Sequence, residues 1–525
     1  MIYRSPFPDI EIPSVPLHEF LFEHVDRWPD KAALIDGPTG RTLTYAQLAA
    51  AVRRTSSGLA ARGFSKGDVC AIYSPNIPEY AIVFFGVAAA GGVSTTVNPT
   101  YTAAELKSQL KDSGATYLVT VPPFLDSARE AVSGTAVKEI FVIGDAAGGA
   151  TPFASLMSDG TPPDVDIDPM KDLVALPYSS GTTGLPKGVM LTHHNLVANL
   201  AQVNAVEQTA QTEVLIAVLP FYHIYGMTVI MAGALRVGAT LVTMPRFELE
   251  EFLSLLQRYG VTTGYLVPPI VLALAKHPVV EAYDLSKMES IMSGAAPLPE
   301  PVGKACAERN DIIVRQGYGL TETSPVTHAN PRSLPIKLSS VGPAMPNTTY
   351  RIVGVETQQD VPQGELGEVW IRGPQVMKGY LNNREATQEM IDDEGWLHTG
   401  DVGRADEDGY LYVVDRVKEL IKYKGLQVAP AELEAIVQSH PAVADVAVIP
   451  SPDEEAGEVP KAFVVVKPGA TLSADELMAF VGTKISPQKR VRRVEFIDAI
   501  PKVPSGKILR RQLVERERQR QAAGS

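Results

Sequence analysis

The sequence predicts an α/β protein with a large N-terminal domain and a smaller C-terminal domain. Its 525 residues exceed what a single hydrophobic core fills. Helical and strand patterns alternate through most of the chain, as in doubly wound folds, and this texture changes after about residue 343. We expect residues 1–415 to form two doubly wound α/β units plus a small β-barrel, and residues 416–525 a separate α+β domain.

The first α/β unit is expected between Phe20 and about Ile143. Thr44 is a suitable N-cap for its first helix. The apolar run 81–97 is interrupted by Gly, Ser and Thr and is short for a membrane span, so it indicates a buried helix that leads into a strand. The expected helices are 45–62, 77–90 and 103–111, and the expected strands are 69–73, 93–97 and 117–121.

The rest of the chain divides into three further regions. A second α/β unit is expected from about 173 to 343, with strands over 214–218, 240–243 and 263–267 and helices over 249–258 and 299–307. Short strands and Gly/Pro turns from 350 to 372 indicate a small β-barrel or meander. Beyond residue 414, we expect helices over 430–439 and 475–484 and strands over 443–449 and 462–467.

Composition points to a globular protein of a reducing compartment. Apolar residues make up 45% and charged residues 20% of the chain. The two cysteines, Cys70 and Cys306, cannot build a disulfide framework and lack the spacing of a zinc site. We find no signal peptide, membrane span or lipidation pattern, and therefore expect a cytoplasmic protein.

Charge is unevenly distributed along the chain. The net charge is −13, yet residues 416–525 hold 18 basic and 14 acidic side chains. Such an asymmetry indicates a C-terminal unit that meets something anionic. Basic and aromatic residues are not interleaved as nucleic-acid binding requires, so a phosphorylated small molecule is favoured over a nucleic acid. A solvated basic helix at the end of the chain is the alternative interpretation.

The stretch Pro177–Met190 concentrates serines, threonines, glycines and one lysine. Glycines allow the backbone to bend close to a ligand, while hydroxyls and an ammonium donate hydrogen bonds to it. The stretch therefore predicts a polyphosphate-binding loop, although its spacing is not that of a Walker A motif. An ordinary Gly/Ser/Thr surface loop is the alternative.

Three later stretches carry residues suited to binding a nucleotide. Between 316 and 323, Tyr318 can stack on a base, and Thr321 and Glu322 offer hard oxygens to phosphate and Mg²⁺. Asp401 follows an apolar segment and suits a ribose diol. Lys507 lies on a Gly-containing turn near the end of the chain. Each signal is weak alone, and their occurrence in this order is informative.

Together these motifs resemble the adenylate-forming superfamily. Four more stretches are most similar to its 4-coumarate–CoA ligase group, and the resemblance runs from about Phe20 to Leu513. These stretches are 220–226, 267–276, 293–298 and 422–430. The resemblance implies a reaction in which a carboxylate attacks Mg²⁺-ATP to give an acyl-adenylate and pyrophosphate, after which coenzyme A displaces AMP. It also implies a mobile C-terminal domain that turns about a hinge near Lys418 between the two steps.

The resemblance also assigns roles to individual residues. Lys507 would bridge the carboxylate and the α-phosphate, while Lys422 and Gln427 would assist the adenylate and thioester steps. His223 would orient the acyl carboxylate, although a lone histidine beside aromatic residues is more often simply packed. Glu322 would bind the metal. The residues implied for ATP and AMP are Ser179, Ser180, Gly181, Thr182, Thr183, Gly184, Lys187, Ala295, Gln316, Gly317, Tyr318, Thr321, Asp401, Arg416 and Lys418.

The acid is implied less strongly than the nucleotide. Val229 stands where plant enzymes of the group usually carry a small polar residue, which favours less substituted rings such as cinnamate or 4-coumarate. A fatty acyl-CoA ligase, a module that loads a carrier protein and a luciferase-like oxidative enzyme are the alternatives. We expect a monomer or homodimer. The implied acyl residues are Tyr225, Val229, Gly294, Gly317, Pro325 and Val326, and those for coenzyme A are Arg246, Lys424 and Gly425.

Overall fold

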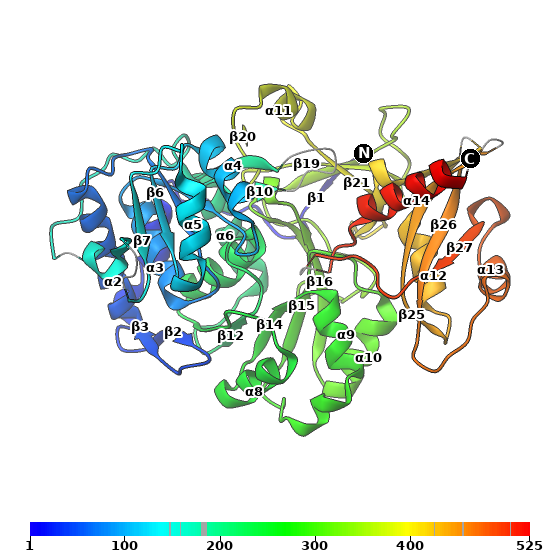
Figure 1. Ribbon diagram of the computed structural model, residues 1–525, viewed down its shortest axis with the longest axis horizontal. Helices are drawn as coiled ribbons and strands as arrows, with labels where there is room; N and C mark the ends of the chain where they lie inside the picture. Colours follow the sequence, from blue (N-terminus) through cyan, green and yellow to red (C-terminus); the bar gives the residue numbers. More distant parts are fainter. Residues whose placement is uncertain are drawn as a thin grey trace.

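The computed structural model describes residues 1–145, 149–157, 159–179, 186–424, 426–453, 456–503 and 506–524. Four sheets organise them, as Figure 1 shows. Two large, mostly parallel sheets carry helices on their faces, and an antiparallel sheet joins them to a fourth sheet near the C-terminus. This is the mixed α/β architecture that the sequence predicts.

The first large sheet contains the strands expected between residues 69 and 121. Thr44 caps the helix α2 (Tyr45–Ala61) as predicted. Its Oγ1 accepts from Gln47 N at 3.2 Å, and Gln47 Oε1 accepts from Thr44 N at 2.9 Å. The strands, in spatial order, are β10 (Tyr178–Ser179), β11 (Lys187–Thr192), β9 (Leu173–Ala175), β5 (Val93–Thr96), β4 (Val69–Tyr73), β6 (Tyr117–Thr120), β7 (Glu139–Val142) and β8 (Thr151–Pro152), with β20 (Gly379–Tyr380) beside β11. The main helices are α2 (Tyr45–Ala61), α3 (Pro78–Ala89), α4 (Ala103–Ser113), α5 (Leu125–Val132) and α6 (His193–Glu207).

The second large sheet is parallel except at its two edges. In spatial order its strands are β17 (Val326–Ala329), β16 (Ile313–Gly319), β15 (Ser290–Ser293), β14 (Thr263–Leu266), β12 (Val214–Ala217), β13 (Thr240–Thr243), β2 (Ala32–Asp36) and β3 (Thr42–Thr44). The helices of this part are α7 (Gly233–Val237), α8 (Leu249–Tyr259), α9 (Pro268–Lys276) and α10 (Glu300–Asn310), with a π-helix, η4 (Tyr225–Ala232), ahead of α7.

The two large sheets exchange strands, which the sequence analysis did not anticipate. Strand β2 pairs in parallel with β13, with Leu34 opposite Leu241, so it belongs to the second sheet. Strand β9 pairs with β5 through Ser94 and Ala175, so it belongs to the first. The expectation of two consecutive units, 20–143 and 173–343, is therefore wrong in its boundaries. A strand pattern reveals the period of a segment but not its distant partner.

The predicted small barrel is an open antiparallel sheet. Its order is β1 (Ile2–Arg4), β18 (Thr349–Val353), β19 (Gly367–Arg372), β21 (Leu397–Ala405) and β22 (Leu411–Arg416). The sequential strands from β18 onward form a meander, and β1 extends it from the other end of the chain. The prediction of a closed barrel is wrong, because the edge strands β1 and β22 are not paired with each other within the described residues.

The last hundred residues form a sheet with an apolar cluster of its own. A 3₁₀ turn, η7 (Val417–Glu419), leads into it from β22. Strand β25 runs past its expected end through Pro450 and Pro452, which still face Pro460 and Glu458 of β26. The elements are β23 (Ile421–Tyr423), β24 (Leu426–Val428), α12 (Pro430–Gln438), β25 (Val443–Asp453), β26 (Gly457–Val466), α13 (Ala474–Gly482), β27 (Arg493–Phe496) and α14 (Arg510–Gly524).

Within the ranges that the structure describes, no helix is both long and apolar enough to cross a bilayer. The predicted helix inside the apolar run 81–97 is α3, and its residues from Tyr80 to Ala88 are buried. Strand β5 follows it and is buried throughout. The run is therefore a core helix and a core strand, as expected.

A buried ion pair holds α6 against the second sheet. The guanidinium of Arg315 in β16 is fully buried and meets the carboxylate of Glu207 through two contacts of 2.8 and 2.9 Å. Arg315 also donates to Asn330 O at 2.9 Å and to Ser290 Oγ at 3.1 Å. These bonds offset the desolvation of both charges.

Removing one partner of this pair should destabilise the protein strongly. We expect Glu207→Ala to lower the free energy of unfolding by about 3–5 kcal/mol, because it leaves Arg315 charged and unpaired in the core. Urea unfolding followed by tryptophan fluorescence measures the change. Glu300→Ala is the control, since Glu300 pairs with Lys304 at the surface, and equal unfolding midpoints for the two variants would contradict the expectation.

Candidate functional site

Glu322 joins the first large sheet to the end of the second. It lies in a 3₁₀ turn, η6 (Thr321–Thr323), directly after β16, and is 7% exposed. Its Oε1 accepts from Ser179 Oγ at 2.9 Å and from Tyr380 OH at 2.8 Å. Burial and the Glu322 carboxylate raise the pKa of Tyr380, so its phenol remains a donor. A carboxylate held in this way offers a fixed hard-oxygen ligand to a cation.

Lys187 stands beside this group. Its Nζ lies 4.8 Å from the centre of the Tyr380 ring, at the start of β11. The remaining predicted phosphate ligands of this loop, Ser180, Gly181, Thr182, Thr183 and Gly184, lie outside the described residues. The structure therefore places the two ends of the loop, Ser179 and Lys187, next to Glu322 and its partner Tyr380.

Asp401 and Arg416 face each other across β21 and β22. Arg416 Nε lies 2.9 Å from Asp401 Oδ1, and Tyr318 OH donates to Asp401 Oδ2. The Asp401 carboxylate raises the pKa of Arg416, and burial followed by Asp401 raises that of Tyr318. The predicted ribose residues and the predicted adenine-binding tyrosine are thus in direct contact, and the carboxylate has a fixed orientation.

Three more of the residues predicted for ATP and AMP divide into two kinds. Ala295 is exposed and adopts a left-handed backbone at φ +68°, directly beyond β15. A side chain at Gly317 would lie 3.3 Å from His328 O, so this position has little room for one. The side-chain amide of Gln316 is hydrogen-bonded to the backbone of Leu298. Its Oε1 accepts from Leu298 N at 2.8 Å, and its Nε2 donates to Leu298 O at 3.2 Å. Its side chain braces the 295–298 segment.

The residues predicted for the acyl group lie on the π-helix η4 and near the ends of β15, β16 and β17. Such helices are rare and often occur at functional sites. Tyr225 OH donates to Met292 O at 3.0 Å, and a Cβ at Gly294 would lie 3.0 Å from the Tyr225 ring. Pro325 and Val326 follow η6, and Val326 is held through both backbone groups by Asn199, at 3.0 and 2.7 Å.

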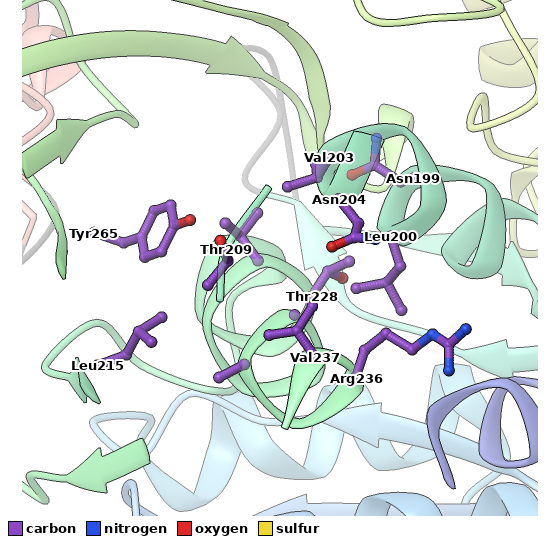
Figure 2. Close-up of a pocket in the computed structure, with 13 residues that line it drawn as sticks. Asn199, Leu200, Val203, Asn204, Thr209, Leu215, Thr228, Arg236, Val237 and Tyr265 are labelled. Carbon is purple, nitrogen blue, oxygen red and sulfur yellow. The ribbon is translucent and has the colours of Figure 1, made fainter. Parts of the chain in front are cut away.

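A small cavity lies behind Val229. Its volume is about 20 Å³, enough for a single water molecule. Figure 2 shows Tyr265 and Arg236 on opposite sides of the residues that line it, with the Tyr265 hydroxyl turned toward Thr209. The ring of Tyr265 also meets Tyr225 edge to face, with centroids 6.3 Å apart. The space beyond Val229 is therefore narrow and partly polar.

His223 is neutral at physiological pH. Its Nδ1 accepts a hydrogen bond from Tyr225 N at 3.3 Å, so the ring proton of the neutral form is on Nε2. The ring remains accessible but lies among protein groups, and desolvation followed by the Lys507 ammonium lowers its pKa to about 4. Nε2–H is therefore available as a neutral donor.

Lys507 enters this site from the C-terminal domain. Figure 1 shows the segment before α14, in red, reaching toward the centre of the molecule near β16. Gly506 touches the start of α9 so closely that a Cβ there would lie 2.6 Å from Pro269 Cγ. Desolvation and the Arg416 charge lower the pKa of Lys507, while Glu419, Asp401 and Glu322 oppose that shift. The lysine therefore lies in the electrostatic field of both carboxylate groups described above.

The residues predicted for the thioester step are placed elsewhere. Lys422 and Lys424 lie on the β23–β24 hairpin, which packs on the C-terminal sheet: Lys422 N donates to Glu458 Oε2 at 2.8 Å and Lys424 N to Ala456 O at 2.9 Å. Gln427 belongs to β24, and Gly425 lies outside the described residues. Arg246 is exposed after β13, where it pairs with Glu248 at 3.0 Å, and Lys418 is exposed in η7.

Sequence reasoning missed two aromatic residues of the site. Tyr380 binds Glu322 and lies under Lys187, yet it comes from β20, whose partner β11 begins 192 residues earlier in the chain. Tyr265 lies in an apolar strand that reads as ordinary core. An aromatic residue in an apolar stretch carries no signal of its own, and only tertiary pairing reveals these positions.

Comparisons with known proteins identify the family of the chain. The AMP-binding enzyme family model matches residues 21–381, and the model of the AMP-binding enzyme C-terminal domain matches residues 432–507. 4-Coumarate–CoA ligase 2 of Petroselinum crispum is 46% identical, covering 98% of this chain and 96% of that protein. 4-Coumarate–CoA ligase of Pinus taeda is 44% identical, covering 98% and 97%.

Solved structures share the whole arrangement. ATP-bound MatB from Rhodopseudomonas palustris matches with a TM-score of 0.89 at 29% identity, covering 96% of this chain and 99% of that one. Apo MatB from the same organism matches with a TM-score of 0.79 at the same identity and coverage. The chain belongs to the AMP-binding enzyme family, among its adenylate-forming acid–CoA ligases.

Proposed function

We propose that the protein converts 4-coumarate or a related hydroxycinnamate to its coenzyme A thioester through an acyl-adenylate. The observation that carries the proposal is the position of Lys507 among Glu322, Asp401, Arg416 and His223, where a carboxylate and an α-phosphate would meet. The names of relatives that are 44–46% identical supply the class of acid.

In the first step, two anions must approach each other. An oxygen of the acyl carboxylate attacks the α-phosphorus, and the bond to pyrophosphate breaks. Lys507 offsets charge on both groups, and Lys187 and Thr321 bind phosphate oxygens. His223 Nε2–H donates to the carboxylate, and Asp401 accepts from the ribose hydroxyls. Arg416 holds Asp401 in place.

Mg²⁺ fits the Glu322 position, because this carboxylate is buried, fixed by two hydroxyl donors and a hard-oxygen ligand. The ion would offset charge on the phosphates of ATP. The chain's own contribution is the placement of that carboxylate between Ser179 and Tyr380.

In the second step, the thiol of coenzyme A attacks the acyl carbon and AMP leaves. Lys422 and Gln427 would assist, and Lys424, Gly425 and Arg246 would contact coenzyme A. These residues require the β23–β24 hairpin to replace Lys507 at the site. We therefore propose two domains, 1–415 and 416–525, that rotate about Lys418 between the steps.

The acyl pocket favours an aromatic acid over a long alkyl chain. A Cβ at Gly294 would lie 3.0 Å from the Tyr225 ring, so the backbone and this ring approach closely, and a flat aromatic acid is the substrate that we expect beside them. The space of about 20 Å³ beyond Val229 is too small for an extended chain.

We also expect the cytoplasm as the compartment, since the thiols of Cys70 and Cys306 are free and buried.

Product formation with a panel of acids tests this function. We expect AMP release that depends on coenzyme A, fastest with 4-coumarate or cinnamate and about tenfold or more slower with methoxylated rings or fatty acids. A coupled AMP assay with cinnamates, benzoates and fatty acids, with and without coenzyme A, measures it. AMP formed equally without coenzyme A would rule out a ligase, and fatty acids reacting fastest would rule out the proposed acid.

Lys507 should matter for the first step alone. We expect Lys507→Ala to slow adenylation about 10²- to 10³-fold, because it removes the charge that bridges the reacting groups. Thioester formation from supplied acyl-adenylate should change little. Lys502→Ala is the control, since Lys502 lies on the same segment as Lys507 but pairs with Asp445, at 2.7 Å. Adenylation that survives in Lys507→Ala contradicts the role.

The pKa of His223 reports the approach of Lys507 in solution. We expect the wild-type imidazole to titrate near pH 4, well below the ordinary 6.5, and therefore to stay neutral above about pH 5. Lys507→Gln removes the smaller of the two causes and should raise this pKa, although desolvation keeps it below 6.5. NMR of ¹⁵N-labelled histidine, assigned with His223→Gln, measures both values. An unchanged pKa in Lys507→Gln would place Lys507 away from the ring.

A further inference from the structure

We propose that Asp415 is a positioning residue that holds the C-terminal domain in the orientation that presents Lys507. It does so by capping a helix of that domain from across the hinge. The inference rests on the proposed two-step function and concerns the choice between the two half-reactions.

The cap joins β22 to the start of α12. Asp415 is 7% exposed, and its Oδ2 accepts a hydrogen bond from Ala431 N at 2.8 Å. Its Oδ1 accepts from Arg416 N at 2.8 Å, which fixes the carboxylate. Asp415 precedes Lys418 in the chain and Ala431 follows it, so the bond from Ala431 crosses the proposed hinge.

Helix α12 has no cap in its own sequence. The first backbone N–H groups of a helix need acceptors, which a side chain just before the helix usually supplies. Here that residue is Ala429, which has no polar side chain, and the next residue is Pro430. Asp415 therefore supplies from the N-terminal domain an acceptor that helix ends normally have nearby.

Apolar contacts accompany the cap. Val402, Leu420 and Ala429 form a small buried cluster, with Val414 and Val417 packed against it. Val402 and Val414 belong to the antiparallel sheet, whereas Leu420 and Ala429 follow the hinge. The orientation that brings in Lys507 is thus held by a hydrogen bond and by packing on both sides of η7.

Helix α12 is in turn tied to the Lys507 segment. Arg510 lies three residues after Lys507, and its Nη2 meets Glu434 Oε2 of α12 at 2.8 Å. Its Nε meets Glu419 Oε2 at 3.2 Å. Arg510 is 13% exposed, so both ion pairs are well shielded from solvent. A bond that fixes α12 therefore also fixes the turn that carries Lys507.

Rotation about Lys418 must break the bond between Asp415 and Ala431. The cap stabilises only the arrangement in which Lys507 faces the nucleotide, so it biases the enzyme toward adenylation. Loss of a helix cap corresponds to an equilibrium change of about two- to thirtyfold. We therefore expect Asp415→Ala to shift the two half-reactions in opposite directions or to slow only the first.

The test measures the half-reactions separately. Pyrophosphate release without coenzyme A should fall about two- to thirtyfold in Asp415→Ala, while thioester formation from supplied acyl-adenylate should hold or rise. Asp415→Asn keeps one acceptor and should be intermediate. Glu432→Ala is the matched control, because Glu432 lies in the first turn of α12 but pairs with Lys489 of its own domain, at 2.8 Å.

Hydrogen exchange of the peptide that contains Ala431 provides a second readout. In the presence of ATP, the backbone amides of this peptide should exchange faster in the Asp415→Ala variant than in the wild type. In the Glu432→Ala variant they should exchange at the wild-type rate. Equal losses in both half-reactions, or unchanged pyrophosphate release with unchanged exchange at Ala431, would overturn the proposal. A wild-type protein that forms no thioester with any acid would instead overturn the proposed function.

Discussion

The ion pair between Asp401 and Arg416 is the contact on which the site depends. Asp401 is 4% exposed, and a charged carboxylate at such a position needs partners that replace water. Arg416 and Tyr318 supply them from β22 and β16, which belong to different sheets. The bond from Tyr318 to Asp401 therefore joins the second large sheet to the antiparallel sheet, and η7 begins at the residue after Arg416.

The proposed hinge divides the predicted site residues into two groups. Glu322 lies in η6, which follows β16, and Tyr225 begins the π-helix η4, which follows β12 of the same sheet. Lys507, in contrast, comes from beyond the proposed hinge. The basic surplus predicted for the C-terminal part is partly neutralised within that domain, since Arg516 and Arg520 both pair with Glu495. The charge surplus alone therefore does not identify a binding surface, and the proposed contribution of this domain to the site is a single lysine, Lys507.

Local patterns predicted local structure well. The strand at 69–73 and the Thr44 cap are found as expected, because each depends on residues within one element. Partner strands were not predictable: β2 pairs with β13 and β1 with β18, contacts that join segments hundreds of residues apart. In the site, Asp401, Arg416 and Tyr318 were named and do meet, and the Gln316 side chain binds the backbone of Leu298, a partner that its motif does not indicate. A motif identifies residues, but it does not show which neighbouring groups form hydrogen bonds with them.

The exchange of strands between the two large sheets has a consequence for synthesis of the chain. Strands β2 and β3 leave the ribosome about 200 residues before β13, the strand that β2 must join. At ordinary rates of translation this interval is roughly 10–40 s. During that time β2 has β3 on one side but lacks β13 on the other, and the first 150 residues cannot complete either sheet. Nascent chains of this protein are therefore expected to depend on chaperones until the second sheet closes.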